Sequence, residues 1–110
     1  MLIALYPGAS LIGSTVRAMV TDAQAQADAA TALHERFQTP IVLSAMDLSA
    51  EAEAFGCEIQ MGDNEVPTVI GRLVTSLASA QALPVPSPGA ARTQVYLDTV
   101  RLLKHESLIR

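Results

Sequence analysis

The sequence predicts an α/β fold whose architecture is incomplete within this chain. The apolar run at 40–46 lies between two helical patterns and leads directly to a single acid, Asp47. A buried strand that delivers a carboxylate at its carboxyl end, just before a helix, is how α/β folds build their sites. The chain then ends on an amphipathic helix, where the next element of an α/β unit would be a parallel strand. We therefore expect part of a larger α/β architecture.

The length and composition of the chain limit it to one domain and exclude two classes of binding partner. The 110 residues are half apolar, but aromatic residues are few and Trp is absent, so we expect a thinly packed core or a surface that needs a partner. The net charge is −4, and the seven basic residues are scattered along the sequence. Neither nucleic acid nor an anionic membrane surface is a predicted partner, because both require a basic stripe or patch.

Cysteine content and hydropathy predict a soluble, cytoplasmic protein. Cys57 is the single cysteine, so no internal disulfide is possible. The apolar start of the chain has no basic segment before it and is too short for a signal peptide. No stretch approaches the ~20 apolar residues of a membrane span.

In the first part of the chain, one long helix is the strongest pattern. Residues 2–6 form an apolar run that a proline–glycine pair ends, which predicts a short strand. A short helical turn follows, capped by Ser10 or Ser14. The long helix then takes Thr21 as its N-cap, shows apolar residues at three- and four-residue steps, and stops at about Phe37.

The rest of the chain alternates short elements with turn signals. The predicted elements are a strand at 40–46, a short helix capped by Ser49 and closed by Gly56, strands at 57–61 and 66–74 around a turn at 62–65, a helix at 76–83, a proline-rich connector at 84–89, and a helix from an N-cap at Thr93 to about Glu106.

Several segments resemble a known family. The sequence resembles the uroporphyrinogen decarboxylase family in four segments. They are the upstream YPGASLIGSTVRAMVTDAQAQADAATALHERF, then MDLSAEAEAFGCEI, then NEVPTVIGRLV, and then LPVPSP before a helix with RLLK. The resemblance is closest to the methylcobamide:coenzyme M and related corrinoid methyltransferases. It implies a (β/α)₈ barrel of ~250 residues. Residues 1–110 would then form a single partial domain, the N-terminal segment of an incomplete barrel.

The resemblance also implies a role for Asp47. In the decarboxylases of this family, the acid after the first barrel strand binds substrate and is catalytic, and Asp47 matches that position. We therefore predict that Asp47 binds substrate or stabilises charge. From the residues alone, the favoured alternative is that Asp47 caps the strand–helix link through an Asx-turn. Glu51 and Glu53 are two apart on a helix and do not face each other, so we predict that they serve the helix dipole.

The resemblance implies cofactors whose ligands would lie in a longer protein. The methyltransferases bind zinc through His and Cys residues of the later barrel, and His34, Cys57 and His105 have neither that position nor ligand spacing. The resemblance thus implies zinc and a corrinoid protein for a longer parent, with no cofactor bound by this chain. The arginine motif of the decarboxylases is also absent, because the corresponding segment reads LYPGASLIG.

Three functions stay open at this point. The first is a zinc-dependent methyltransferase that moves a methyl group from a methylated corrinoid protein to a thiol, with this chain inactive alone. The second is a non-catalytic α/β binding or assembly module. The third and weaker one is uroporphyrinogen decarboxylation. An incomplete barrel exposes a sheet edge and an apolar helix face, so we also predict a homo-oligomer.

Overall fold

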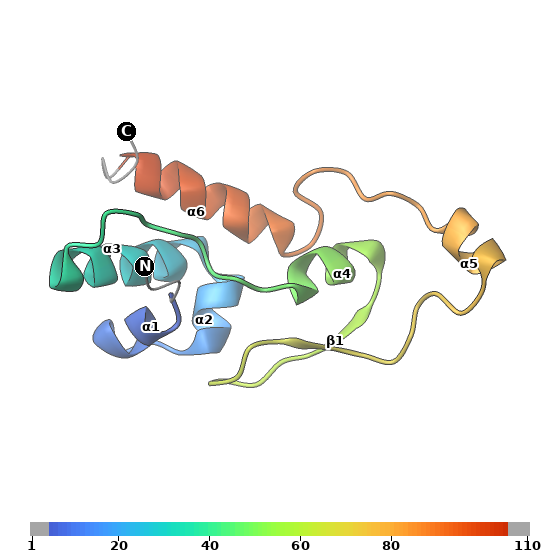
Figure 1. Cartoon of the computed structure of the whole chain (residues 1–110), viewed down its shortest axis with the longest axis horizontal. Helices are drawn as coiled ribbons and strands as arrows, with labels where there is room; N and C mark the ends of the chain where they lie inside the picture. Colours follow the sequence, from blue (N-terminus) through green and yellow to red (C-terminus); the bar gives the residue numbers. More distant parts are fainter. Residues whose placement is uncertain (1–4, 106–110) are drawn as a thin grey trace.

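The structure is a computed structural model, and it describes residues 5–105. The elements are α1 (Pro7–Leu11), α2 (Val16–Thr21), α3 (Ala23–Phe37), α4 (Ser49–Phe55), β1 (Glu58–Gln60), β2 (Thr68–Ile70), α5 (Leu77–Ala82) and α6 (Thr93–His105). The molecule is elongated, with extents of 49 × 28 × 24 Å and a radius of gyration of 15.5 Å. A compact domain of this length would have a radius of about 13 Å. The elongation comes from α5, which lies at one end of the long axis, far from α1, α2 and α3 (Figure 1).

Helix α3 is the centre of the packed part, and its caps explain its limits. The Asp22 side chain accepts hydrogen bonds from the backbone N–H groups of Gln24 and Ala25, at 2.8 and 3.4 Å. Asp22 is therefore the N-cap, and the predicted cap at Thr21 is wrong by one residue, because Thr21 closes α2 instead. The predicted end at Phe37 is confirmed, and Gln38 follows in the left-handed conformation with φ 50°.

The core is thin, as its alanine content predicts. Helices α1, α2 and α6 pack against α3, and most of the buried apolar positions are alanines with a few larger side chains such as Met19 and Leu103. Small residues allow close approach: a Cβ on Gly8 would lie 2.6 Å from the carbonyl oxygen of Ala29 on α3. Glycine at this position therefore sets the distance between α1 and α3.

The N-terminal region differs from its prediction. Of the predicted strand at 2–6, residues 2–4 lie outside the described residues, and Leu5 and Tyr6 are not in a strand. Pro7 instead begins α1, since its fixed φ and missing N–H suit a first helical position. Thr15, rather than Ser10 or Ser14, caps α2, with its Oγ1 accepting from the Ala18 N–H at 3.1 Å.

The predicted strand at 40–46 is not formed. This segment runs beside α3 without regular structure (Figure 1), because no described strand pairs with it and a strand requires a hydrogen-bonded neighbour. One buried side chain fixes it instead. The Gln26 Oε1 accepts from the Ala45 N–H at 3.1 Å, and the Gln26 Nε2 donates to the Met19 carbonyl at 2.8 Å.

Beyond α4 the chain forms an arm. Strands β1 and β2 pair antiparallel, with Ile59 opposite Val69, so both predicted strands are confirmed in shortened form. Helix α5 is also confirmed, and a capping box between Ser76 and Ser79 begins it. None of its residues is buried, and the predicted connector at 84–89 leads back to α6 without helix or strand.

The final helix agrees with its prediction to within one residue. Thr93 is the first residue of α6 rather than its cap, and Glu106 lies outside the described residues. Within residues 5–105, no helix is long and apolar enough to cross a membrane.

Candidate functional site

Asp47 lies at the end of the 40–46 segment, and its carboxylate is buried, with 0% of the side chain exposed. The Oδ1 atom accepts hydrogen bonds from the backbone N–H and the hydroxyl of Ser49, at 2.9 and 2.5 Å. The Oδ2 atom accepts from Arg92 Nη1 at 2.5 Å and from the Tyr96 hydroxyl at 3.2 Å. The bond to the Ser49 N–H is an Asx-turn. The carboxylate therefore links the start of α4 to α6.

Arg92 completes this site, and no local pattern in the sequence predicts its role. Its guanidinium contacts three partners: Nη1 binds Asp47, Nη2 donates to the Ser49 hydroxyl at 2.8 Å, and Nε donates to Glu53 at 2.5 Å. The residue is 8% exposed. Glu53, which was predicted to serve the helix dipole, thus forms an ion pair. The partners lie 39 to 45 residues from Arg92, so no spacing rule would connect them.

The charges at this site hold Asp47 ionised. Burial raises the pKa of the Asp47 carboxyl, but the hydrogen bonds from Ser49 and Arg92 and the charge of Arg92 outweigh burial, so the pKa lies below its ordinary value. With four hydrogen bonds the carboxylate has no free lone-pair direction for abstracting a proton. It provides a fixed negative charge, and its predicted catalytic role stays a prediction.

Two tyrosines surround the carboxylate and remain protonated. The Tyr6 hydroxyl donates to the Met46 carbonyl at 2.6 Å. Burial, with the nearby Asp47 charge, raises the pKa of Tyr6 to about 12. The same two causes raise the pKa of Tyr96 further above its ordinary value. Both phenols are therefore hydrogen-bond donors, and neither is a base, at physiological pH.

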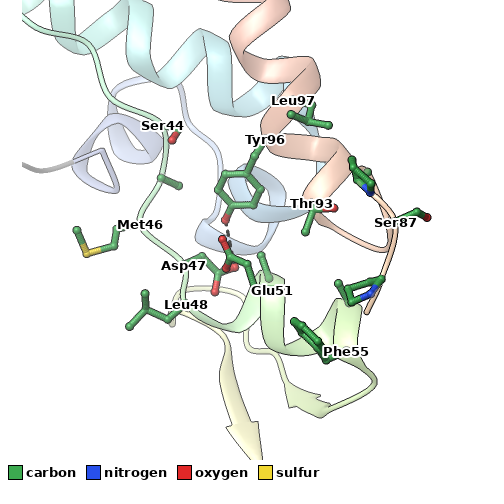
Figure 2. Close-up of a pocket in the computed structure, with 16 residues that line it drawn as sticks. Ser44, Met46, Asp47, Leu48, Glu51, Phe55, Ser87, Thr93, Tyr96 and Leu97 are labelled. Atoms are coloured by element: carbon green, nitrogen blue, oxygen red, sulfur yellow. Dashed lines mark hydrogen bonds between the residues drawn. The ribbon is translucent and has the colours of Figure 1, made fainter. Parts of the chain in front are cut away.

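A cavity of about 590 Å³ opens beside Asp47. Its walls are residues 44–48, one side of α4, the connector at 86–89 and the first turns of α6. Figure 2 shows the Tyr96 hydroxyl directed at the Asp47 carboxylate, with Glu51 and Phe55 of α4 beside them. The volume is in the range of small-molecule sites, which are mostly apolar with a few placed polar groups.

Helix α4 positions one wall of this cavity. It begins at Ser49, which is a helical residue and not the predicted N-cap: Leu48 holds that place without a side-chain bond. Asp47 takes over the capping function through its bond to the Ser49 N–H. The predicted end is confirmed, because Gly56 is the left-handed C-cap with φ 108°.

The remaining candidate residues do not join this site. His34 contacts the Thr39 carbonyl through Nδ1 at 3.0 Å, Cys57 follows α4, and His105 ends α6. Across residues 5–105, no group of three or more His, Cys, Asp or Glu residues is placed to hold a metal ion. The described residues therefore do not fit the zinc that the resemblance implies.

The chain matches a known protein family over most of its length. The family model described as "Uroporphyrinogen decarboxylase (URO-D)" matches residues 7–108, and the chain belongs to this family. Among curated proteins, none matches the chain.

A solved structure shares the fold. A methyltransferase from Methanosarcina mazei superposes with a TM-score of 0.79 and 24% sequence identity, covering 94% of this chain and 31% of that one. The chain therefore spans under a third of that methyltransferase's length. Together with the family match, this confirms the predicted fold class: an α/β segment of a (β/α)₈ barrel that is incomplete in this chain.

Proposed function

We propose that this chain is the N-terminal part of a methyltransferase that moves a methyl group from a methylated corrinoid protein to a thiol. The observation that carries the proposal is the cavity beside Asp47, on a chain whose fold matches part of a methyltransferase. In a complete barrel, side chains at the carboxyl ends of the strands line the active site. Residues 40–46 form no strand in this structure, and we propose that they are the first strand of the complete barrel, which would put Asp47 at such an end.

In this proposal Asp47 acts as a fixed charge. Arg92, Ser49 and Tyr96 hold its carboxylate in one position, so no reorganisation is needed when charge develops in the cavity. A methyl group that is transferred to a thiol moves with positive character, and a nearby negative charge favours that movement. General-base catalysis by Asp47 would first require exchange of one of its four hydrogen bonds.

The proposed cofactor and partner lie outside this chain. Because the described residues do not fit zinc, we derive no step through it and propose that its ligands belong to the rest of a longer parent. The corrinoid protein is likewise a proposed partner of that parent. The isolated chain is then inactive. We also place the protein in the cytoplasm, on the basis of its single, unpaired cysteine.

The test is an assay of methyl transfer from methylcobalamin to coenzyme M. The reaction is monitored through the absorbance change that accompanies loss of the cobalt-bound methyl group. We compare the 110-residue chain with the product of the complete reading frame, both supplied with zinc. We expect activity in the longer protein alone. The Asp47→Asn variant should lose about 10²–10³ of the rate, while Asp98→Asn, an exposed control, keeps it. A longer protein that methylates no thiol refutes the proposal.

One observation favours the assembly module as a second candidate. The arm exposes apolar side chains such as Leu77 and Val85, which are 75% and 84% exposed. Surfaces of this kind mark interfaces. Light scattering on the isolated chain tests this candidate and the proposed homo-oligomer together, and a monomer at all concentrations contradicts both.

Decarboxylation is the weakest of the three candidates. A decarboxylase must bind a substrate carboxylate. Helix α1 has no arginine, and Arg92 already contacts Asp47, Glu53 and Ser49.

A further inference from the structure

We infer that the free edge of strand β2 is a self-association surface, at which two copies of this chain pair as antiparallel strands. The inference rests on the proposed homo-oligomer, because it names the surface through which that oligomer forms. It does not depend on the proposed methyl transfer, since β2 lies outside the lining of the cavity beside Asp47.

Strand β2 has a hydrogen-bonding partner on one side only. Within the described residues the sheet consists of β1 and β2, so no strand lies beside the other edge of β2. The two strands run along one side of the molecule, below α4 (Figure 1). A hairpin of two strands is marginally stable by itself, and a third strand satisfies the free N–H and C=O groups of its edge. The edge of β2 is therefore open to the addition of a strand.

The side chains on and after β2 suit burial by a partner. Every residue from 68 to 78 is exposed, and Arg72 is the single charged residue of this run. Its large apolar side chains are between 38% and 75% exposed: Val69, Ile70, Leu73, Val74 and Leu77. Strand β1 differs because it carries Glu58, and a charge on an edge strand opposes pairing. The pairing surface is therefore the edge of β2 and not that of β1.

The charges at the two ends of β2 point to a second copy as the partner. Glu65 precedes the strand and Arg72 follows it, and neither side chain forms an ion pair with any residue between 5 and 105. In an antiparallel pair centred on Val69, Arg72 of each copy lies next to Glu65 of the other, because these residues are three and four positions from that centre. A two-fold axis repeats the contact, so the pair contains two ion pairs around an apolar centre. The edge is thus complementary to itself.

Analytical ultracentrifugation of the 110-residue chain over a range of concentrations tests this surface. We expect a monomer–dimer equilibrium. The Val69→Lys variant should be a monomer, because each copy would bring a lysine to the centre of the pair. The matched control is Val100→Lys, which introduces the same charge at an exposed apolar position of α6. It should keep the dimer, and circular dichroism verifies that both variants are folded.

Charge reversal tests the ion pairs separately from the apolar centre. Arg72→Glu and Glu65→Arg should each weaken the dimer about tenfold at low ionic strength, because the symmetric pair contains two exposed ion pairs. The double variant Arg72→Glu/Glu65→Arg should regain the original dissociation constant. Both positions are exposed, so these changes should leave the fold of the monomer intact.

The inference is overturned if the chain is a monomer at all concentrations, or if the double variant associates no more tightly than the two single ones. It is also overturned if Val100→Lys dissociates the dimer and Val69→Lys does not, a result that would move the homo-oligomer to the apolar face of α6. A longer protein that pairs through β2 but methylates no thiol refutes the proposed methyltransferase alone. Thiol methylation by a longer protein that does not pair refutes this inference alone.

Discussion

Replacing Arg92 with methionine removes the cation from a buried ion pair and leaves the Asp47 carboxylate without its strongest partner. The two side chains are 9% and 0% exposed. Breaking such a pair from one side costs about 3–5 kcal/mol, because an uncompensated charge stays buried. A domain of this length has a total stability of about 5–15 kcal/mol. We therefore expect Arg92→Met to lose a large part of the free energy of unfolding.

Urea denaturation followed by circular dichroism measures this loss. With a slope of about 1–3 kcal/mol per molar, the midpoint should fall by at least about 1 M. The matched control is Arg101→Met, on α6, the helix that begins one residue after Arg92. Arg101 pairs with Asp98, and the two side chains are 68% and 43% exposed, so its loss should cost less than about 1 kcal/mol.

The double variant Asp47→Asn/Arg92→Met separates the charge from the shape of the site. It removes both charges, so it should be less destabilised than the sum of the two single variants. If Arg92→Met is as stable as Arg101→Met, the ion pair does not hold α4 to α6 and our account of the site is wrong.

Three further predictions follow from the same contacts. The pKa of the Asp47 carboxyl is lowered in the folded protein, so its ionised form stabilises the fold at pH values above its unfolded pKa of about 4. This stabilisation is lost as pH falls through the folded pKa. In Asp47→Asn, the free energy of unfolding should therefore fall less steeply at acid pH. Tyr6 and Tyr96 have raised pKa values, about 12 for Tyr6, so the folded protein should show little phenolate absorbance at pH 11, in contrast to the chain in guanidinium. Gly8→Ala should lose about 1–3 kcal/mol in urea denaturation, because the new Cβ would meet the Ala29 carbonyl.

Each of these has a clear contrary result. An equally steep acid limb in Asp47→Asn would show that other carboxyls cause it. Phenolate that forms near pH 10 in the folded protein would contradict the burial of the two hydroxyls. Gly62→Ala is the control for Gly8→Ala, since its Cβ would lie at an ordinary 3.6 Å from its neighbour. Equal stability of the two variants would refute the close approach of α1 and α3.

Local signals predicted the helices well. The long pattern up to Phe37 and the serine before α5 specify their elements through contacts within a few residues. Cap positions were less certain for a physical reason: Thr21 and Asp22 are both good caps, and only the backbone angles of the folded chain decide between them. The same applies to Thr15 against Ser14.

Long-range partners were beyond sequence reasoning. The place of Asp47 after an apolar run indicates a site residue, but its pairing with Arg92 joins residues 45 apart. The predicted strand at 40–46 failed for the related reason that strand formation depends on a neighbour. The residue types of an apolar run can favour a strand. The strand still does not form where no described segment lies alongside the run and hydrogen-bonds to its backbone.

The Gln26 side chain has a consequence for exchange of backbone hydrogens with solvent. Its amide oxygen takes the Ala45 N–H, while no other amide of residues 41–46 donates a hydrogen bond within the described part of the chain. In deuterated water, the Ala45 amide should therefore exchange slowly among fast neighbours, since protection follows hydrogen bonding and burial. Gln26→Leu should release that one site and leave the hydrogens of α6 protected. A single amide on a helix thus does locally what a neighbouring strand would do along the whole segment.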